Sequence, residues 1–462
     1  CGIVGFVNYK QDISNYKNIL LQMNNTLSRR GPDEEGNFID KHVALAHKRL
    51  IIIDPDGGKQ PMRKKGPTPD SHFTIVYNGQ IYNTKELRQI LEEHNFTFES
   101  HSDTEVLLKS YIYYGRDVVN HLNGIFAFAI WDSEKEELFM ARDHFGVKPL
   151  FYTMQNNSFI FASEIKALFQ YPGVQKILDK QGICELFGIG PAHTPGTTIF
   201  NNIFELKPAH FAIFNHSGLH IEKYWSLKSE PHTETFAQTC AHLDFLLKDA
   251  ITRQLVSDVP LCTFLSGGLD SSIITKYAAD YCYENGLPPL NTYSIDYVDN
   301  DKNFVKSDFQ PNSDNYYINL MNKNLHTNHH QIVIDTPELA EYLEDAMIAR
   351  DMPGMADIDS SLILFWKKVK NQPQQYLLQV NVQMKSLGDI LGFSEKMLFK
   401  VELFHGQLQS QSVKLYYIQA LQKKLNLKIT LIIDIKKVFL NLKFWIQIQL
   451  KLLKKEKYHI LQ

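Results

Sequence analysis

The clearest alternation of apolar and polar stretches lies in the middle of the chain. An apolar run at residues 259–265 is followed by a polar, glycine-rich stretch, and a longer, largely apolar stretch begins at residue 273 and ends at residue 283. This order is typical of a buried strand, a tight loop and the start of a helix. β-rich runs at residues 292–296 and 329–334 predict two more strands in the same region.

The glycine-rich stretch between the predicted strand and helix has the composition of an anion-binding loop. It reads Ser266-Gly267-Gly268-Leu269-Asp270-Ser271-Ser272. Two adjacent glycines allow a sharp turn that directs successive backbone N–H groups into one concavity, and Ser271 and Ser272 are expected to cap the helix. Asp270 would hold a magnesium ion beside a bound phosphate or pyrophosphate. The alternative is an ordinary strand-to-helix turn, and the absence of a following Lys excludes the GxxxxGK[ST] loop.

The chain begins with Cys1, at the head of a short apolar run. We expect that the initiator Met has been removed. The free α-amino group, with an intrinsic pKa of about 8, can then act as the base for the thiol of the same residue. A single terminal cysteine can also be incidental, so the rest of the first 210 residues decides between the two interpretations.

Several segments after Cys1 predict local structure that is unremarkable when each is taken alone. Residues 46–54 predict a strand with Arg49 near its head. Asn78-Gly79 predicts a turn between β-rich flanks, and Ser102-Asp103-Thr104-Glu105 predicts the N-terminal cap of a helix over residues 106–114.

Together with Cys1, these segments resemble in order and spacing the class II glutamine amidotransferases, which are N-terminal-nucleophile hydrolases. The likeness continues through residues 124–129, 141–150 and 161–164 to about residue 210. It implies an αββα sandwich in which Cys1 attacks the side-chain amide of glutamine and Asn78 and Gly79 stabilise the oxyanion. By the same resemblance, Arg49 binds the substrate carboxylate and Asp103 its ammonium group, and the glutamine site includes Ile52, Ile53, Asn78, Gly79 and Gln80. The family usually has Glu where this chain has Gln80, a departure that removes a negative charge from the ammonium pocket.

The glycine-rich loop resembles the pyrophosphatase loop of enzymes that split ATP into AMP and pyrophosphate. A class II glutaminase followed by such a loop is similar to the family of glutamine-dependent asparagine synthetases, over about residues 1–370. The resemblance implies a glutaminase domain at residues 1–210 and a parallel-sheet α/β domain at residues 211–370, with ATP as a substrate and Mg²⁺ at Asp270. The ATP-binding residues that it implies are Leu265, Ser266, Gly267, Gly268, Leu269, Asp270, Ser271 and Ile295. Arg350 is expected to face the α-phosphate and the aspartyl intermediate.

The amino-acid composition limits the binding partners and the cellular compartment that we expect for this protein. The net charge of −3 gives no argument for attraction to nucleic acid or to a membrane surface. Five cysteines, an odd number without metal-ligand spacing, favour a reducing compartment, and we expect a cytoplasmic protein. The expected partners are glutamine, aspartate and ATP, with a homodimer as the assembly. His329 and His330 could suggest a metal site, but they flank a predicted strand without a third ligand nearby and favour a structural role.

The character of the sequence changes after Lys370. No Pro follows Pro373, no Gly follows Gly406, and the family string Ala-Asp-Glu-Ile-Phe-Gly-Gly-Tyr-Pro-Trp-Phe is absent. Codons permitted for residues 382–393 encode this very string when the third base of each codon is joined to the first two bases of the next. We therefore infer a frameshift between residues 365 and 376, with residues 371–462 as out-of-frame translation. The alternative is a divergent helical domain.

Overall fold

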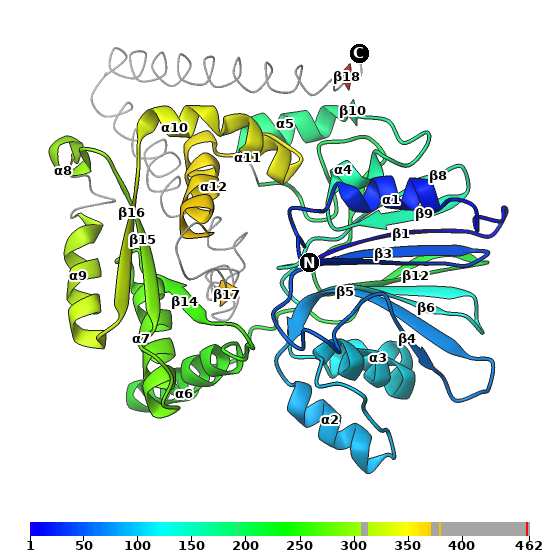
Figure 1. Cartoon of the computed structure of the whole chain (residues 1–462), viewed down its shortest axis with the longest axis horizontal. Helices are drawn as coiled ribbons and strands as arrows, with labels where there is room; N and C mark the ends of the chain where they lie inside the picture. The colour runs from blue at the N-terminus through cyan, green and yellow to red at the C-terminus, as the bar shows by residue number, and fades with distance from the viewer. Residues whose placement is uncertain (191, 306–312, 371–377, 380–458, 461–462) are drawn as a thin grey trace.

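Two antiparallel sheets of six strands each stack face to face in the first half of the chain (Figure 1). This computed structural model describes residues 1–190, 192–305, 313–370, 378–379 and 459–460. Sheet A contains, in spatial order, β11 (Phe204–Glu205), β8 (Phe151–Gln155), β9 (Ser158–Ala162), β1 (Gly2–Asn8), β3 (Val43–Arg49) and β2 (Glu34–Ile39). Sheet B contains β13 (Gly218–Lys223), β12 (His210–Asn215), β7 (Glu137–Arg142), β6 (Gly124–Asp132), β5 (His72–Ile81) and β4 (Met62–Lys65).

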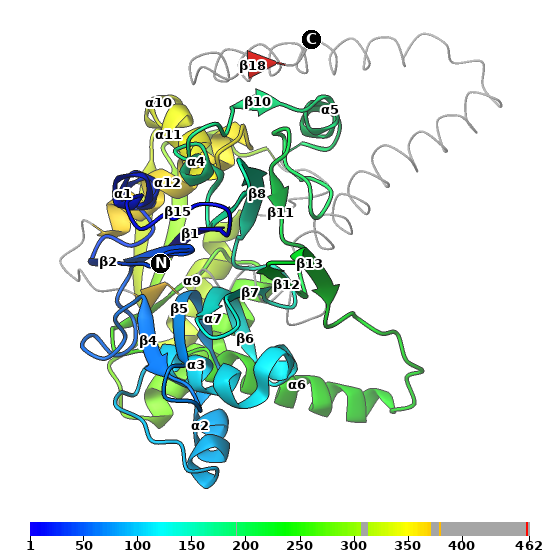
Figure 2. The same cartoon turned by 90° about the vertical axis from the view of Figure 1, so that its right-hand side faces the viewer.

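Helices cover the two outer faces of this pair of sheets. α1 (Lys17–Asn25) and α4 (Ile165–Leu168) pack on sheet A, whereas α2 (Thr84–Glu93) and α3 (Asp103–Tyr114) lie under sheet B (Figures 1 and 2). A short 3₁₀ helix follows α3 at Gly115–Asn120, and β10 (Ile177–Leu178) and α5 (Lys180–Ile189) lie beyond α4. The predicted αββα sandwich is confirmed.

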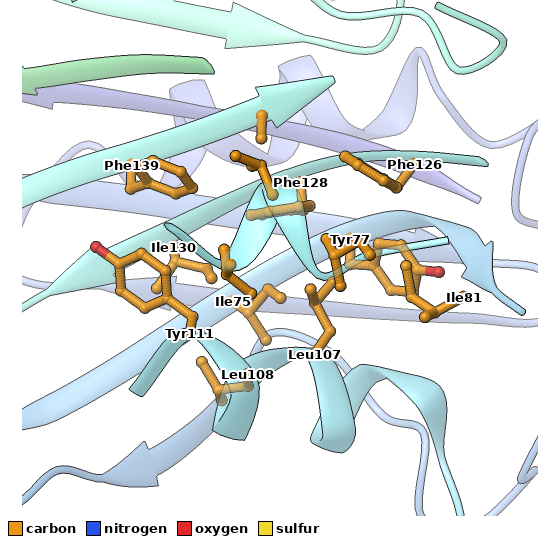
Figure 3. Close-up of a cluster of buried hydrophobic side chains, with 14 of the residues drawn as sticks. Ile75, Tyr77, Ile81, Leu107, Leu108, Tyr111, Phe126, Phe128, Ile130 and Phe139 are labelled. Atoms are coloured by element: carbon orange, nitrogen blue, oxygen red, sulfur yellow. The ribbon is translucent and has the colours of Figure 1, made fainter. Parts of the chain in front are cut away.

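Side chains alternate across the strands, so each sheet contributes to two cores. Val7, Leu45, Ala129 and Phe161 lie in the layer between the sheets. The opposite face of sheet B packs on α3 through a second cluster, rich in aromatic rings (Figure 3). Its labelled members are Ile75, Tyr77, Ile81, Leu107, Leu108, Tyr111, Phe126, Phe128, Ile130 and Phe139.

A parallel sheet forms the second unit, as expected. Its order is β16 (Asn328–Ile334), β15 (Asn291–Tyr297), β14 (Leu261–Phe264) and β17 (Leu378–Gln379), and every neighbouring pair is parallel. The helices of this unit are α6 (Phe236–Arg253), α7 (Leu269–Glu284), α8 (Asn300–Asn303), α9 (Asp314–Leu325), α10 (Thr336–Glu341), α11 (Leu343–Arg350) and α12 (Ala356–Lys370). α6 and α7 share one apolar cluster, and α12 packs on the sheet through Phe365.

The turn between α11 and α12 attaches the second unit to the first. Met352 is buried in the apolar cluster of the first unit that also holds Leu20 and Leu168. Asp351 is buried as well, accepts a hydrogen bond from the Ile165 backbone amide at 2.6 Å and pairs with Lys166 at 3.1 Å. Burial raises the pKa of the Asp351 carboxyl to about 6, although Lys166 acts in the opposite direction.

Two local predictions in the first unit are wrong, and pairing between strands explains both. Residues 46–54 are not one strand: β3 ends at Arg49, because its neighbour β1 begins at Gly2, which pairs with Lys48. Asn78 and Gly79 do not form a turn but continue β5, paired with Ala127 and Phe126 of β6. Cross-strand pairing on a long neighbouring strand has overridden the local turn propensity of Asn-Gly.

Of the two predicted N-terminal helix caps, the one at α3 is confirmed and the one at α7 is wrong. Ser102 caps α3 and accepts a hydrogen bond from the Thr104 amide, as predicted. At α7 the N-cap position is Gly268 rather than Ser271 or Ser272, which lie within the first turn. Both serine hydroxyls instead donate to the Gly268 carbonyl, at 3.1 and 2.8 Å, so their hydrogen-bonding capacity is used inside the loop.

The connection between the two units leaves sheet B after β13 and reaches α6 along the outside of the molecule (Figure 2). The first domain is predicted to end at about residue 210. In the structure, β12 and β13 continue sheet B of the first unit to Lys223. Among the described residues, no helix is long and apolar enough to cross a bilayer. The frameshift inferred for residues 371–462 lies outside the described residues, apart from β17 and the two-residue β18 (His459–Ile460), which pairs with β10.

The aromatic cluster under sheet B yields a test of stability. Phe128 is fully buried, so Phe128→Ala should lower the free energy of unfolding by about 3–5 kcal/mol. Met154→Ala is a suitable control, because Met154 is 46% exposed and its truncation should cost less than about 1 kcal/mol. Urea unfolding measures both variants, and equal losses would show that the cluster does not stabilise the sandwich.

Candidate functional site

The thiol of Cys1 lies where sheet A ends. Because Gly2 pairs with Lys48, the residue before Gly2 comes to rest beside Arg49 and Leu50. The Leu50 amide donates to Cys1 Sγ at 3.4 Å, and the sulfur lies 3.6 Å from the Leu50 carbonyl oxygen. The amide contact favours the nucleophilic thiolate, whereas the carbonyl can accept a hydrogen bond only from the protonated thiol.

The α-amino group of Cys1 is held on the other side of the residue. It donates to the Arg30 carbonyl at 2.9 Å, and Arg30 Nε donates back to the Cys1 carbonyl at 2.9 Å. Burial lowers the pKa of this amine well below its usual value, and the positive charges of Arg30 and Lys148 act in the same direction. The lowered pKa favours the neutral amine, which is the form that can accept a proton from the thiol. Arg30 is itself fixed by Glu164 at 3.0 Å.

A pocket opens in front of the thiol. Its lining residues are Cys1, Arg49, Leu50, Ile52, Ile53, Gly58, Gln60, Tyr77, Gly79, Gln80, Ser102, Asp103 and Thr104. Seven of the residues predicted from sequence are thus brought together from the chain start, the end of β3, the end of β5 and the start of α3. Asn78 does not line the pocket but lies buried between two lining residues, and among the described residues its Nδ2 has no hydrogen-bond partner. A buried donor without an acceptor is suited to an oxyanion that forms during reaction.

Arg49 is buried and already surrounded by acceptors. Its Nη1 pairs with Glu34 at 2.6 Å and donates to the Pro55 carbonyl at 2.8 Å. Its Nη2 donates to the carbonyls of Ile53 and Asp54 at 3.2 and 2.5 Å. These contacts fix the guanidinium at the pocket wall. A substrate carboxylate at Arg49 would have to share it with Glu34.

Asp103 faces the pocket from the first turn of α3. Tyr77 donates its hydroxyl to this carboxylate at 2.9 Å, and the Ile81 amide donates at 3.2 Å. Burial raises the pKa of Asp103, whereas both hydrogen bonds oppose this shift. An ammonium group placed beside the carboxylate would favour its ionised form.

Gln80 has a partner in the second unit. Its Nε2 donates to the Val256 carbonyl at 2.8 Å. A carboxylate at this position could not donate to a carbonyl, so the amide that departs from the usual family residue is matched to this contact.

The glycine-rich loop lies between β14 and α7 as predicted. Gly267 has φ +81°, and a side chain there would meet the Asp314 carbonyl at 2.8 Å, so glycine is required. The Ser266 amide donates to the Ser271 hydroxyl at 3.2 Å, which closes the loop around the helix start. The exposed loop and the N-terminus of the 16-residue helix α7 form an anion-binding geometry.

The remaining residues implied for ATP lie in the same unit. Ile295 lies on β15, the strand next to β14, and the Leu265 amide donates to the Tyr293 carbonyl of β15 at 2.8 Å. Arg350 ends α11, where its guanidinium contacts both oxygens of Asp359 at 3.0 and 3.2 Å. This ion pair holds the Arg350 side chain against α12. The expected contact of Arg350 with a phosphate remains a prediction.

Asp270 lies exposed in the first turn of α7. Mg²⁺ in nucleotide sites is usually held by one or two carboxylates together with phosphate oxygens and water. A single exposed carboxylate beside an anion-binding loop fits that pattern. Within the described ranges, no cluster of three or more His, Cys, Asp and Glu side chains forms a complete metal site.

The paired histidines have structural partners. His329 Nδ1 lies 2.9 Å from the Thr292 hydroxyl and its Nε2 lies 3.0 Å from the Ser294 hydroxyl. His330 stacks on Tyr293. These contacts join β15 to β16 and support the structural interpretation.

Several residues that line or support the Cys1 pocket were not predicted from the sequence. Leu50 and Tyr77 adjoin residues that were predicted, so neighbourhood in sequence is a signal that could have found them. Gln60 carries no such signal: it reaches the pocket because its Oε1 accepts the Tyr77 amide at 2.6 Å. Arg30 and Glu164, which fix the Cys1 backbone, were not predicted as site residues.

Comparison with known proteins agrees with this arrangement. Residues 1–225 match the model of the glutamine amidotransferase domain, and residues 242–379 match the model of asparagine synthase. Asparagine synthetase [glutamine-hydrolyzing] 3 of Bacillus subtilis is 50% identical over 372 residues, which are 80% of this chain and 60% of that protein. Asparagine synthetase [glutamine-hydrolyzing] 1 of the same species is 34% identical over 64% of this chain and 45% of its own.

The chain thus spans less than two thirds of the length of these Bacillus proteins. The putative asparagine synthetase [glutamine-hydrolyzing] 2 of Methanocaldococcus jannaschii is 32% identical over 372 residues, with 76% of this chain and 68% of that protein covered. The two domain matches follow each other in the order of the two structural units. The chain belongs to the family of glutamine-hydrolysing asparagine synthetases.

Proposed function

We propose that this protein hydrolyses glutamine at the Cys1 pocket and uses the ammonia to convert aspartate, activated by ATP, into asparagine. The observation that carries the proposal is the terminal thiol with its own buried amine of lowered pKa, placed at a pocket that also holds Arg49, Gly79 and Asp103. The second unit supports the proposal with an anion-binding loop at the start of α7.

In the first half-reaction, the Cys1 amine takes the thiol proton and the thiolate attacks the side-chain carbonyl of glutamine. The resulting oxyanion accepts hydrogen bonds from Asn78 Nδ2 and the Gly79 amide. The protonated amine then gives its proton to the departing ammonia, which leaves a thioester on Cys1. Water hydrolyses the thioester to glutamate, with the same amine as the base.

Arg49 and Asp103 select a substrate that carries both an α-carboxylate and an α-ammonium group. Their opposite charges and fixed positions match the two ends of an amino acid. Ile52 and Ile53 complete the wall between them.

In the second half-reaction, the loop from Ser266 to Ser271 binds the phosphates of ATP, and Asp270 holds a magnesium ion beside them. A magnesium ion held by Asp270 would supply positive charge against the charge that develops on pyrophosphate. The aspartate side chain becomes adenylated, Arg350 faces the α-phosphate, and ammonia displaces AMP. Ammonia has to travel between the sites within the protein, because water would protonate it.

A second candidate is favoured by the shifted-frame string at residues 382–393. If residues 371–462 are translated out of frame, the chain retains glutaminase but lacks the Asp-Glu segment that would face the glycine-rich loop. In that case we expect a cytoplasmic protein that catalyses only the first half-reaction, the hydrolysis of glutamine.

Replacing the nucleophile tests the first half-reaction. Cys1→Ala should reduce glutamate release from glutamine by at least about a thousandfold, because nucleophile and base act as one unit. Cys184→Ala provides the matched control, since Cys184 is an exposed free cysteine on α5 and its loss should leave the rate unchanged. Undiminished glutamate release by Cys1→Ala would exclude Cys1 as the nucleophile.

The lowered pKa of the Cys1 amine predicts the pH dependence. Only the neutral amine is a base, so kcat/KM for glutamine should rise with pH along a limb that is centred below the usual pKa of an α-amino group. Lys148→Met removes a positive charge that lowers this pKa, and the rising limb should therefore move to higher pH. A wild-type limb centred at pH 8 or above would contradict the role of burial.

Pyrophosphate release separates the two candidates for the second half-reaction. With aspartate, ATP, Mg²⁺ and ammonium supplied, a chain with the reading frame restored should release pyrophosphate about 10²–10³-fold faster than the present chain. The restored Asp-Glu segment would add electrostatic stabilisation of the leaving pyrophosphate opposite the glycine-rich loop. Equal rates would refute the frameshift account, and resequencing the DNA around codon 370 would confirm or refute the lesion directly.

A further inference from the structure

A short segment of the second unit touches the wall of the glutamine pocket. Residues 256–258 lie in the connection between α6 and β14, and β14 leads into the glycine-rich loop. The Ser257 hydroxyl donates to the Val259 carbonyl at 2.9 Å and accepts from the Val259 amide at 3.1 Å, so the segment is a defined turn.

Asp258 makes three contacts across this boundary. Its backbone amide donates to the Ile52 carbonyl at 3.1 Å. Its carboxylate accepts the Asp54 amide at 2.8 Å and lies 3.2 Å from His101 Nε2. One residue of the second unit therefore holds both ends of the Ile52–Asp54 loop, which bears two lining residues of the pocket.

The Ile52–Asp54 loop needs such support. Asp54 has φ +49°, a conformation that costs free energy for a residue with a side chain. Within the first unit, the Asp54 carboxylate accepts amides of Gly57 and His101 at 2.7 and 2.9 Å. The Asp54 carbonyl accepts Arg49 Nη2 and the Gly58 amide of the first unit, whereas the Asp54 amide is directed to Asp258, so the second unit completes the hydrogen bonding of this backbone.

Gln80, which also lines the pocket, provides a separate contact with this segment. Its side-chain amide donates to the carbonyl of Val256, which lies two residues before Asp258 in the chain. Residues 256–258 therefore contact both Gln80 and the Ile52–Asp54 loop of the same pocket.

We propose that Asp258 is a positioning residue for the glutamine site, which the second unit supplies to set the affinity for glutamine through the Ile52–Asp54 loop. This inference rests on the proposed function. Asp258 touches neither the thiol nor the pocket interior, so its removal changes substrate binding rather than the chemical step. Because the turn continues into β14, the same contact joins the glutamine pocket to the strand that carries the ATP loop.

The test compares Asp258→Ala, Asp258→Asn and Glu86→Gln in the full chain. The Asp258 side chain is 43% exposed, so loss of its charge-assisted hydrogen bond should raise KM for glutamine about tenfold in Asp258→Ala, with kcat within about twofold of wild type. Asp258→Asn keeps an acceptor for the Asp54 amide and should raise KM by about threefold. Glu86→Gln breaks the neighbouring Arg253–Glu86 ion pair between the units without touching the pocket, and should change neither constant.

A second measurement reports binding without turnover. Iodoacetamide modifies Cys1, and the glutamine concentration that halves this rate measures affinity in each variant. A protection midpoint that rises in the order wild type, Asp258→Asn, Asp258→Ala supports the inference. Unchanged midpoints and KM values, or an equal rise in Glu86→Gln, would overturn it. If wild type shows neither turnover nor protection by glutamine, the proposed function fails first, and this inference falls with it.

Discussion

The site depends on the register of one strand. β1 lies between β3 and β9, and the pairing of Gly2 with Lys48 fixes where the chain start comes to lie. A shift by one residue would turn every side chain of β1 to the other face and carry Cys1 away from Leu50. The buried sandwich therefore stabilises the position of the thiol, and burial of the same residue lowers the pKa of its amine. Fold and chemistry follow from the same packing.

The second unit is attached to the first close to the machinery of the glutamine site. Behind the nucleophile, Arg30 links Cys1 to Glu164, Lys166 joins Glu164 to Asp351, and Asp351 follows Arg350 in the chain. At the pocket mouth, Asp258 holds the backbone of the Ile52–Asp54 loop. Two separate chains of contacts thus lead from the glutamine site to residues near the predicted ATP site. For the proposed reaction, in which ammonia passes from one site to the other, this attachment would keep the two sites in one geometry.

Sequence reasoning was most successful where a residue acts through its own chemistry. Cys1, Arg49, Gly79 and Asp103 were predicted and share one pocket, and the sandwich and the parallel sheet were predicted as well. It failed where a distant partner decides the local structure, since the paired neighbour β6 keeps Asn78-Gly79 in a strand. Gln60 and Asp258 could not be found from sequence, because only tertiary packing places them. Their roles come from backbone contacts, which leave no pattern in a single sequence.

The central claim is that Cys1 carries the acyl group during glutamine hydrolysis. Rapid acid quenching of the full chain during turnover, followed by peptide mass spectrometry, would locate any γ-glutamyl thioester. The account predicts the glutamyl mass on the N-terminal peptide that contains Cys1, and its absence when glutamine is replaced by glutamate. A glutamyl adduct on Cys184 or Cys240, or turnover without any thioester at Cys1, would contradict it.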